Sequence, residues 1–140
     1  MSALAHLQSL SPAVQGHLAC ALAALVLGPL VLWSKKGSPL HRGAGYLWVA
    51  LMLGAATTSV FIRDYRLPNI AGFTPIHLLT VLTFTGIGGA MVAVLRGRIT
   101  AHRRAMQQVY IGGCLVAGAF TLLPGRFLGG LLWRDLLGWV

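Results

Sequence analysis

Four long stretches of this chain carry almost no charge, and they limit its fold more than any other feature. They cover residues 12–33, 39–62, 75–95 and 101–123. A helix needs about 20 apolar residues to cross the hydrocarbon core of a bilayer, and each stretch is long enough. Charged residues make up 9% of the sequence, against about a quarter in soluble domains. We therefore expect an all-α membrane protein, a single transmembrane domain over residues 1–140.

Hydroxyl residues stand directly before these stretches or at their start, as helix N-caps do. They are Ser11, Ser38, Thr74 and Thr100, and proline follows the first three, which suits the first helical position. The pattern predicts a four-transmembrane-helix bundle. The remaining tail, residues 126–140, is too short for another span, and we expect a C-terminal amphipathic helix on the membrane interface.

The charge of the chain is strongly positive and unevenly placed. Eleven Lys and Arg residues face two acidic ones, for a net charge of +9. Because the basic residues sit in short clusters between apolar runs, we expect contact with the lipid bilayer and not with nucleic acid. Seven lie in or beside two loops: Lys35, Lys36, Arg42, Arg96, Arg98, Arg103 and Arg104. The positive-inside rule then predicts that both termini lie outside and the two basic loops lie in the cytoplasm; for a bacterial inner-membrane protein, the termini would be periplasmic.

The two halves of the chain resemble each other. When GHLACALAALVLGPLVLWSKKGSPLHRGAGYLWV is set above IHLLTVLTFTGIGGAMVAVLRGRITAHRRAMQQVY, His17 aligns with His77 and His41 aligns with His102. The basic loops coincide as well. This alignment predicts two repeated helical hairpins in parallel orientation, related by an axis along the membrane normal.

The repeat places two histidines near each membrane surface. His17 and His77 fall near the outer end of the bundle, and His41 and His102 fall near the inner end. With a rise of about 1.5 Å per residue, the two levels are roughly 20 Å or more apart, so one four-histidine metal site is excluded. Each level can instead supply two axial ligands for a b-type haem, one imidazole from each of two helices.

Further residues fit this haem hypothesis. On the helix face of each histidine, several of the following side chains are small, which would leave room for a porphyrin edge. The faces are Ala21, Ala24 and Gly28 after His17; Gly45, Trp48 and Met52 after His41; Val81, Phe84 and Gly88 after His77; and Met106, Val109 and Gly113 after His102. Basic side chains would pair with haem propionates. The predicted cofactor-binding residues are thus His17, His41, His77 and His102, with Lys36, Arg42, Gly45, Arg103 and Arg104.

Other interpretations of the same residues remain open. Histidines near helix ends also serve as interfacial anchors, and small residues also serve helix packing. The protein would then be a cofactor-free accessory subunit of a larger respiratory or photosynthetic complex. Copper or zinc binding and a quinone contact are further alternatives. With no nucleophile beside a base and with two acidic residues in the chain, we expect an electron carrier or subunit in preference to a stand-alone enzyme.

Proline and aromatic residues add two expectations. Pro29 lies inside the first span, and its missing N–H frees one backbone carbonyl that a neighbouring group should bond. Four aromatic residues suit a belt at the membrane interface: Trp33, Tyr46, Trp48 and Tyr110.

The paired motifs HRGAGYLWV and HRRAMQQVY, each after a helix that starts with GHL or IHL, resemble an uncharacterised family of small bacterial four-helix membrane proteins. That family is a domain of unknown function, and the resemblance covers about residues 13–123. It implies four spans and singles out His17, His77 and the two His-Arg pairs, without implying an activity. The pairing of histidines is also similar to that of the ascorbate-type transmembrane diheme cytochromes b, which carry electrons between two haems.

Overall fold

The computed structural model describes residues 3–63, 70–74 and 76–138, and within them it is helical without any strand longer than an isolated bridge. Its elements are α1 (Ala3–Gln8), α2 (Pro12–Trp33), α3 (Pro39–Val60), α4 (Ile76–Leu95), α5 (Ile99–Tyr110), the π-helix η1 (Ile111–Val116), α6 (Ala117–Thr121), α7 (Phe127–Gly130) and the π-helix η2 (Leu131–Leu136).

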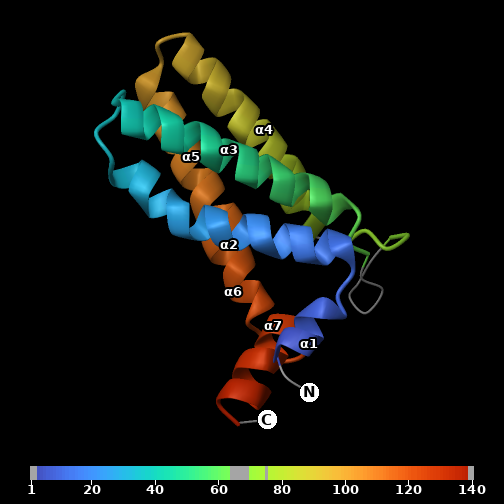
Figure 1. Cartoon of the computed structure of the whole chain (residues 1–140). Coiled ribbons are helices and arrows are strands. Elements are labelled where there is room, and N and C mark those ends of the chain that lie inside the picture. Colours follow the sequence, from blue (N-terminus) through green and yellow to red (C-terminus); the bar gives the residue numbers. More distant parts are fainter. Residues whose placement is uncertain (1–2, 64–69, 75, 139–140) are drawn as a thin grey trace.

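The long helices form a bundle of two hairpins (Figure 1). α2 packs against α3, α4 packs against α5, and α3 joins the hairpins by contacting α4. The segment α5–η1 contacts both α2 and α4 and closes the bundle. α6 continues this segment away from the others and has no buried residue (Figure 1).

Three helices of the described residues are long and apolar enough to cross a membrane: Pro12–Trp33, Pro39–Val60 and His77–Leu95. The first predicted span therefore matches α2, the second ends two residues early at Val60, and the third corresponds to α4, with Pro75 outside the described residues. The fourth segment is helical from 99 to 121, but η1 interrupts it. The count of four spans and the internal repeat stay predictions.

Two predicted N-caps are confirmed and one is wrong. Ser11 accepts a hydrogen bond from the Val14 N–H, and Ser38 accepts one from the His41 N–H. Thr100 does not cap, because α5 begins one residue before it. Gly97, at a φ of 69°, closes α4 in a Schellman turn in which the Arg98 N–H reaches the Ala93 carbonyl at 2.8 Å. The chain re-enters the helix directly after this turn.

Pro29 sets the contact at the centre of the bundle. It cannot donate to the Leu25 carbonyl four residues earlier, and the Tyr110 hydroxyl donates to that carbonyl instead, at 3.1 Å. Gly28 makes the approach possible, because a Cβ on it would overlap the Tyr110 ring. The expectation of a neighbouring partner for the freed carbonyl is confirmed.

Trp48 lies beside this contact and also bonds α2. Its indole N–H donates to the Ala24 carbonyl at 3.0 Å, and its ring centroid is 6.4 Å from that of Tyr110. Trp48 and Tyr110 are 3% and 8% exposed, so their assignment to an interfacial belt is wrong. Both side chains reach carbonyls that only the folded bundle brings near them. Trp33 and Tyr46 are largely exposed.

The helix faces that follow the histidines are turned into the bundle in three helices. Ala24 and Gly28 on α2, Trp48 and Met52 on α3, and Val109 on α5 are buried. On α4 the corresponding residues Val81, Phe84 and Gly88 are exposed. The buried face of α4 contains Thr80, Thr83, Ile87 and Ala90. Thr80 bonds Ser59 of α3, and Thr83 donates to the Leu79 carbonyl of α4 itself. This face lies toward α3 and η1.

The C-terminal tail is helical from 127 to 136 and folds back on the end of α6. The Trp133 indole N–H donates to the Leu122 carbonyl at 2.7 Å. Gly129 lies against the Leu123 carbonyl, where a Cβ would not fit. The interfacial placement of residues 126–140 stays a prediction, and Trp139 lies outside the described residues.

The bond from Tyr110 to the Leu25 carbonyl gives a testable prediction. Tyr110→Phe should lower the free energy of unfolding by about 1 kcal/mol, because it leaves a carbonyl without a partner in an apolar interior. Pro29→Ala restores a backbone N–H for the same carbonyl, so Tyr110→Phe should cost much less in that background.

Unfolding of the four proteins of this double-mutant cycle in detergent micelles measures the coupling. An equal cost of Tyr110→Phe in both backgrounds would show that the hydroxyl does not replace the missing N–H. Tyr46→Phe, on an exposed tyrosine of α3, is the matched control and should leave stability unchanged.

Candidate functional site

The four predicted histidines all lie within the first turns of helices and are all partly buried. His17 is on α2, His41 on α3, His77 on α4 and His102 on α5. In α2, α3 and α5 the histidine begins the stripe of buried residues that continues toward the middle of the bundle. The histidines are therefore placed against neighbouring helices.

Three of the histidines bond a carbonyl of the adjacent helix through Nδ1. His17 lies 2.8 Å from the Ala55 carbonyl oxygen, and His102 lies 2.9 Å from that of Ala90. His41 lies 3.1 Å from the Val31 carbonyl oxygen and 3.1 Å from the Ser34 hydroxyl. Since a carbonyl can only accept, Nδ1 carries the proton in each ring. In the neutral form, Nε2 of these three histidines is an unprotonated lone pair, as a metal ligand requires.

His77 has the opposite arrangement. Its Nδ1 accepts the backbone N–H of Thr74 at 3.1 Å, as the third helical residue does in a capping box. The proton of the neutral ring is therefore on Nε2. This atom is buried, and it has no hydrogen-bond partner within the described part of the chain.

The structure does not join the predicted pairs directly. Within residues 3–63, 70–74 and 76–138, each hydrogen bond of the four imidazoles goes to a carbonyl, a serine or a threonine. No group of three or more metal-ligating side chains occurs among them either.

The middle of the bundle is packed with side chains. The Tyr110 ring occupies the space beside Gly28, and a Cβ on Gly113 would be 2.8 Å from the Met52 methyl carbon. Gly45 packs toward Val31 of α2. The expectation that Gly28 and Gly113 leave room for a porphyrin is wrong, because large residues from other helices fill both places. A haem would have to lie nearer the helix ends.

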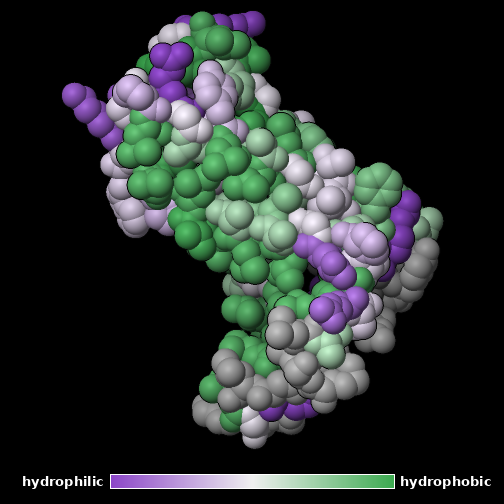
Figure 2. Space-filling view, viewed as in Figure 1, coloured by the Kyte–Doolittle hydropathy of each residue, from purple (hydrophilic) through white to green (hydrophobic). Residues whose placement is uncertain are grey.

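The two helix connections at residues 34–38 and 96–98 lie at the same end of the bundle, which we call the basic end (Figure 1). Arg42, Arg103 and Arg104 are exposed there, and Figure 2 shows hydrophilic residues gathered at this end of an apolar body. Lys36 donates to the carbonyls of Val31, Leu32 and Ser34 at the end of α2. Burial, and then the charge of Arg103, lowers the pKa of Lys36. Cations from the two hairpins therefore lie close to one another.

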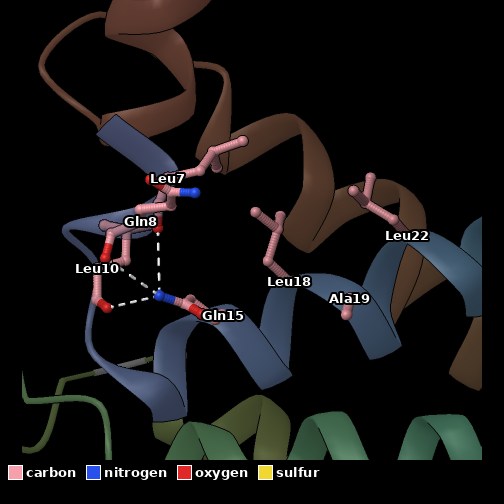
Figure 3. Close-up of a pocket in the computed structure, with 7 residues that line it drawn as sticks. All are labelled: Leu7, Gln8, Leu10, Gln15, Leu18, Ala19 and Leu22. Carbon is pink, nitrogen blue, oxygen red and sulfur yellow. Dashed lines mark hydrogen bonds between the residues drawn. The ribbon is translucent and has the colours of Figure 1, made fainter. Parts of the chain in front are cut away.

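A cavity of about 290 Å³ lies between α1 and α2 (Figure 3). Leucine and alanine side chains line most of it, and the two polar lining residues are Gln8 and Gln15. The Gln15 amide donates to the Leu7 and Leu10 carbonyls at 3.3 and 2.9 Å. This amide ties the short α1 to α2, and no predicted site residue lines the cavity.

The sequence model of a family described as "predicted membrane protein (DUF2306)" matches residues 14–130. The chain belongs to this family. The DUF2306 match includes all four histidines and both His-Arg motifs, so the expected membership of an uncharacterised membrane family is confirmed. The family description places the chain in a membrane and names no activity. No curated protein and no solved structure matches the chain significantly.

Sequence reasoning missed the difference between the histidines. Nothing in the alignment of His17 with His77 indicates that one ring would bond a distant carbonyl and the other its own helix start. The signal for His77 was present in the Thr74–His77 spacing, which is the spacing of a capping box.

The opposite tautomers are directly measurable. In protein labelled with ¹⁵N-histidine and reconstituted in nanodiscs, neutral His17, His41 and His102 should show a protonated Nδ1, and His77 a protonated Nε2. Single His→Gln variants assign the signals. Four identical tautomers would contradict the hydrogen-bond scheme.

Proposed function

We propose that this membrane protein is a b-type haem-binding electron carrier, with His41 and His102 as the axial ligands at the basic end. The observation that carries the proposal is their shared geometry. Each holds its Nδ1 proton on a carbonyl of the preceding helix, at 3.1 and 2.9 Å, and each keeps Nε2 as a lone pair. Axial histidines are commonly oriented by such a second bond.

The charges at this end support the same proposal. Arg42, Arg103, Arg104 and Lys36 come from both hairpins and suit the propionates of a haem, since charge-assisted bonds to carboxylates are strong. Ser34 bonds Nδ1 of His41 and donates its own proton to the Val31 carbonyl, so it orients the ring. A bound haem would supply one-electron redox chemistry.

The opposite end fits a second haem less well. His17 keeps an unprotonated Nε2, as iron ligation needs. His77 carries its proton on Nε2 and would have to break the bond from the Thr74 N–H to Nδ1 before Nε2 could bind iron. The pair His17/His77 therefore stays a prediction. Together with the positive-inside rule, the proposal places the basic end in the bacterial cytoplasm and both termini in the periplasm. An electron carrier without a sizeable soluble domain also needs a redox partner or a larger complex.

A cofactor-free accessory subunit is the second candidate, and the packed centre of the bundle favours it. Tyr110 against Gly28 and Met52 against Gly113 fill the centre of the bundle with side chains. In this case the imidazoles of His17, His41 and His102 fasten neighbouring helices through their carbonyls. Copper or zinc binding to two histidines is a third possibility, which lacks carboxylate or thiolate ligands beside them in the described residues.

An absorption spectrum separates these candidates. Protein produced with ample haem supply should show a reduced-minus-oxidised b-type band, with about one haem per chain. His41→Ala and His102→Ala should each remove nearly all of it, whereas His17→Ala should retain it. Ser34→Ala should keep the haem but shift its midpoint potential, because the ring loses an orienting partner.

A colourless protein under these conditions overturns the haem proposal. Recovery of a larger complex with the colourless protein would then support the accessory subunit, and copper or zinc found by elemental analysis would support the third candidate. A band that halves in His17→Ala would restore the two-haem arrangement.

A further inference from the structure

Among the residues that the structure describes, none accepts a hydrogen bond from the buried Nε2–H of His77. The ring cannot simply exchange the proton, because Nδ1 already accepts the Thr74 N–H. Buried donors are nearly always paired, since an unpaired one gives up its hydration without a replacement.

The nearby hydroxyls do not meet this need. Thr74 is buried, but its hydroxyl lies at Nδ1, on the other side of the ring. Thr80, one turn further along α4, is bonded to Ser59 of α3 at 2.8 Å. Ser59 in turn donates to the Ala56 carbonyl. The polar groups of this region are therefore paired with one another, and the Nε2–H is left over.

An aromatic and apolar surface adjoins the donor. The Phe73 ring meets the His77 ring edge to face, with centroids 5.0 Å apart. Phe73 is 43% exposed, and Ile70, which is bonded to it across the turn, is 84% exposed. A ligand that reaches His77 here would arrive from the membrane or its interface, and most of its contact would be apolar.

This surface is held in a defined shape. Ile70 and Phe73 exchange two backbone hydrogen bonds of 3.0 Å across a tight turn. Ala71, in the turn, has a φ of 54°, a conformation that is unfavourable for alanine. Arg63 stabilises the turn by donating to the Ala71 carbonyl at 3.1 Å, and its guanidinium lies 4.0 Å from the Phe73 ring centroid. The turn therefore keeps Phe73 beside His77.

We propose that a membrane quinone binds at this end of α4, with one ring carbonyl accepting the hydrogen bond from Nε2 of His77. A quinone combines the required features: a carbonyl acceptor, no charge, an aromatic-sized ring that can contact Phe73, and solubility in the bilayer. Arg63 retains further N–H groups for the second carbonyl. This site is separate from the basic end, and the proposal holds with or without a haem there.

Ester carbonyls of phospholipids offer the same acceptor chemistry, so the experiment must distinguish the two sources. The full chain is reconstituted in nanodiscs of diether phospholipid, which has no ester carbonyl. Ubiquinone-1 and menaquinone-1, each labelled with ¹³C at a ring carbonyl, are then added. At least one should bind with a carbonyl stretch shifted to lower frequency, and the His77 ¹⁵Nε2 signal should move on binding.

His77→Phe keeps a ring beside Phe73 but removes the donor, and we expect at least tenfold weaker quinone binding and no shifted carbonyl. Thr85→Val is the matched control on the same helix, because Thr85 is exposed and bonds only carbonyls of α4. It should bind quinone as the unaltered protein does.

If His77→Phe fails to fold, the quinone-binding measurement on the wild-type protein still tests the proposal. Absence of binding by both quinones overturns it, as does equal affinity in folded His77→Phe. A His77 ¹⁵Nε2 signal that shifts between ester and ether lipids, and not on addition of quinone, assigns the donor to a lipid carbonyl and also overturns it.

Discussion

The bundle depends on one hydrogen bond at its centre, from the Tyr110 hydroxyl to the carbonyl that Pro29 leaves free. In the apolar interior of a membrane protein the hydrophobic effect between helices is weak, so close packing and polar contacts determine association. The proline creates an acceptor in the middle of α2, and Gly28 beside it admits the ring. Together they attach the second hairpin to the first at a defined height.

Every histidine site is positioned relative to this contact. Trp48 shares the central layer with Tyr110 and bonds α2 as well, which sets the distance between α2 and α3. His17 and His41 then reach carbonyls of each other's helix at the two ends of that hairpin. Each of these two imidazoles thereby serves two purposes. Its Nδ1 bond to a carbonyl joins two helices, and the same bond leaves Nε2 as the unprotonated ring nitrogen.

Local features of the fold were readable from the sequence. The bounds of α2, the serine caps of α2 and α3, and the buried faces of α2, α3 and α5 depend on apolar runs, short spacings and helical periodicity, all of which lie within a few residues.

The features that depend on distant partners were not readable. Tyr110 and Trp48 looked like interfacial aromatics, because their acceptors are on another helix. The buried face of α4 was missed for a similar reason, since Thr80 bonds Ser59 of α3 at 2.8 Å, a partner that only the folded bundle provides. The carbonyl of Leu25 that Pro29 leaves free was visible in advance, while its donor, 85 residues from Leu25 along the chain, was not.

The π-helix η1 has a consequence for the resemblance between the two hairpins. In the predicted repeat, Ala55 and Val116 hold equivalent places, each 14 residues after the histidine of its helix. A π turn adds one residue to a helix, and each residue of an α-helix accounts for about 100° of rotation. The backbone after Ile111 is therefore turned relative to its counterpart in α3. His17 meets the Ala55 carbonyl, whereas His77 meets no equivalent group from Val116. If the predicted repeat holds, the π turn offsets the two hairpins after Ile111, and the two aligned histidines bond different partners, the Ala55 carbonyl for His17 and the Thr74 N–H for His77.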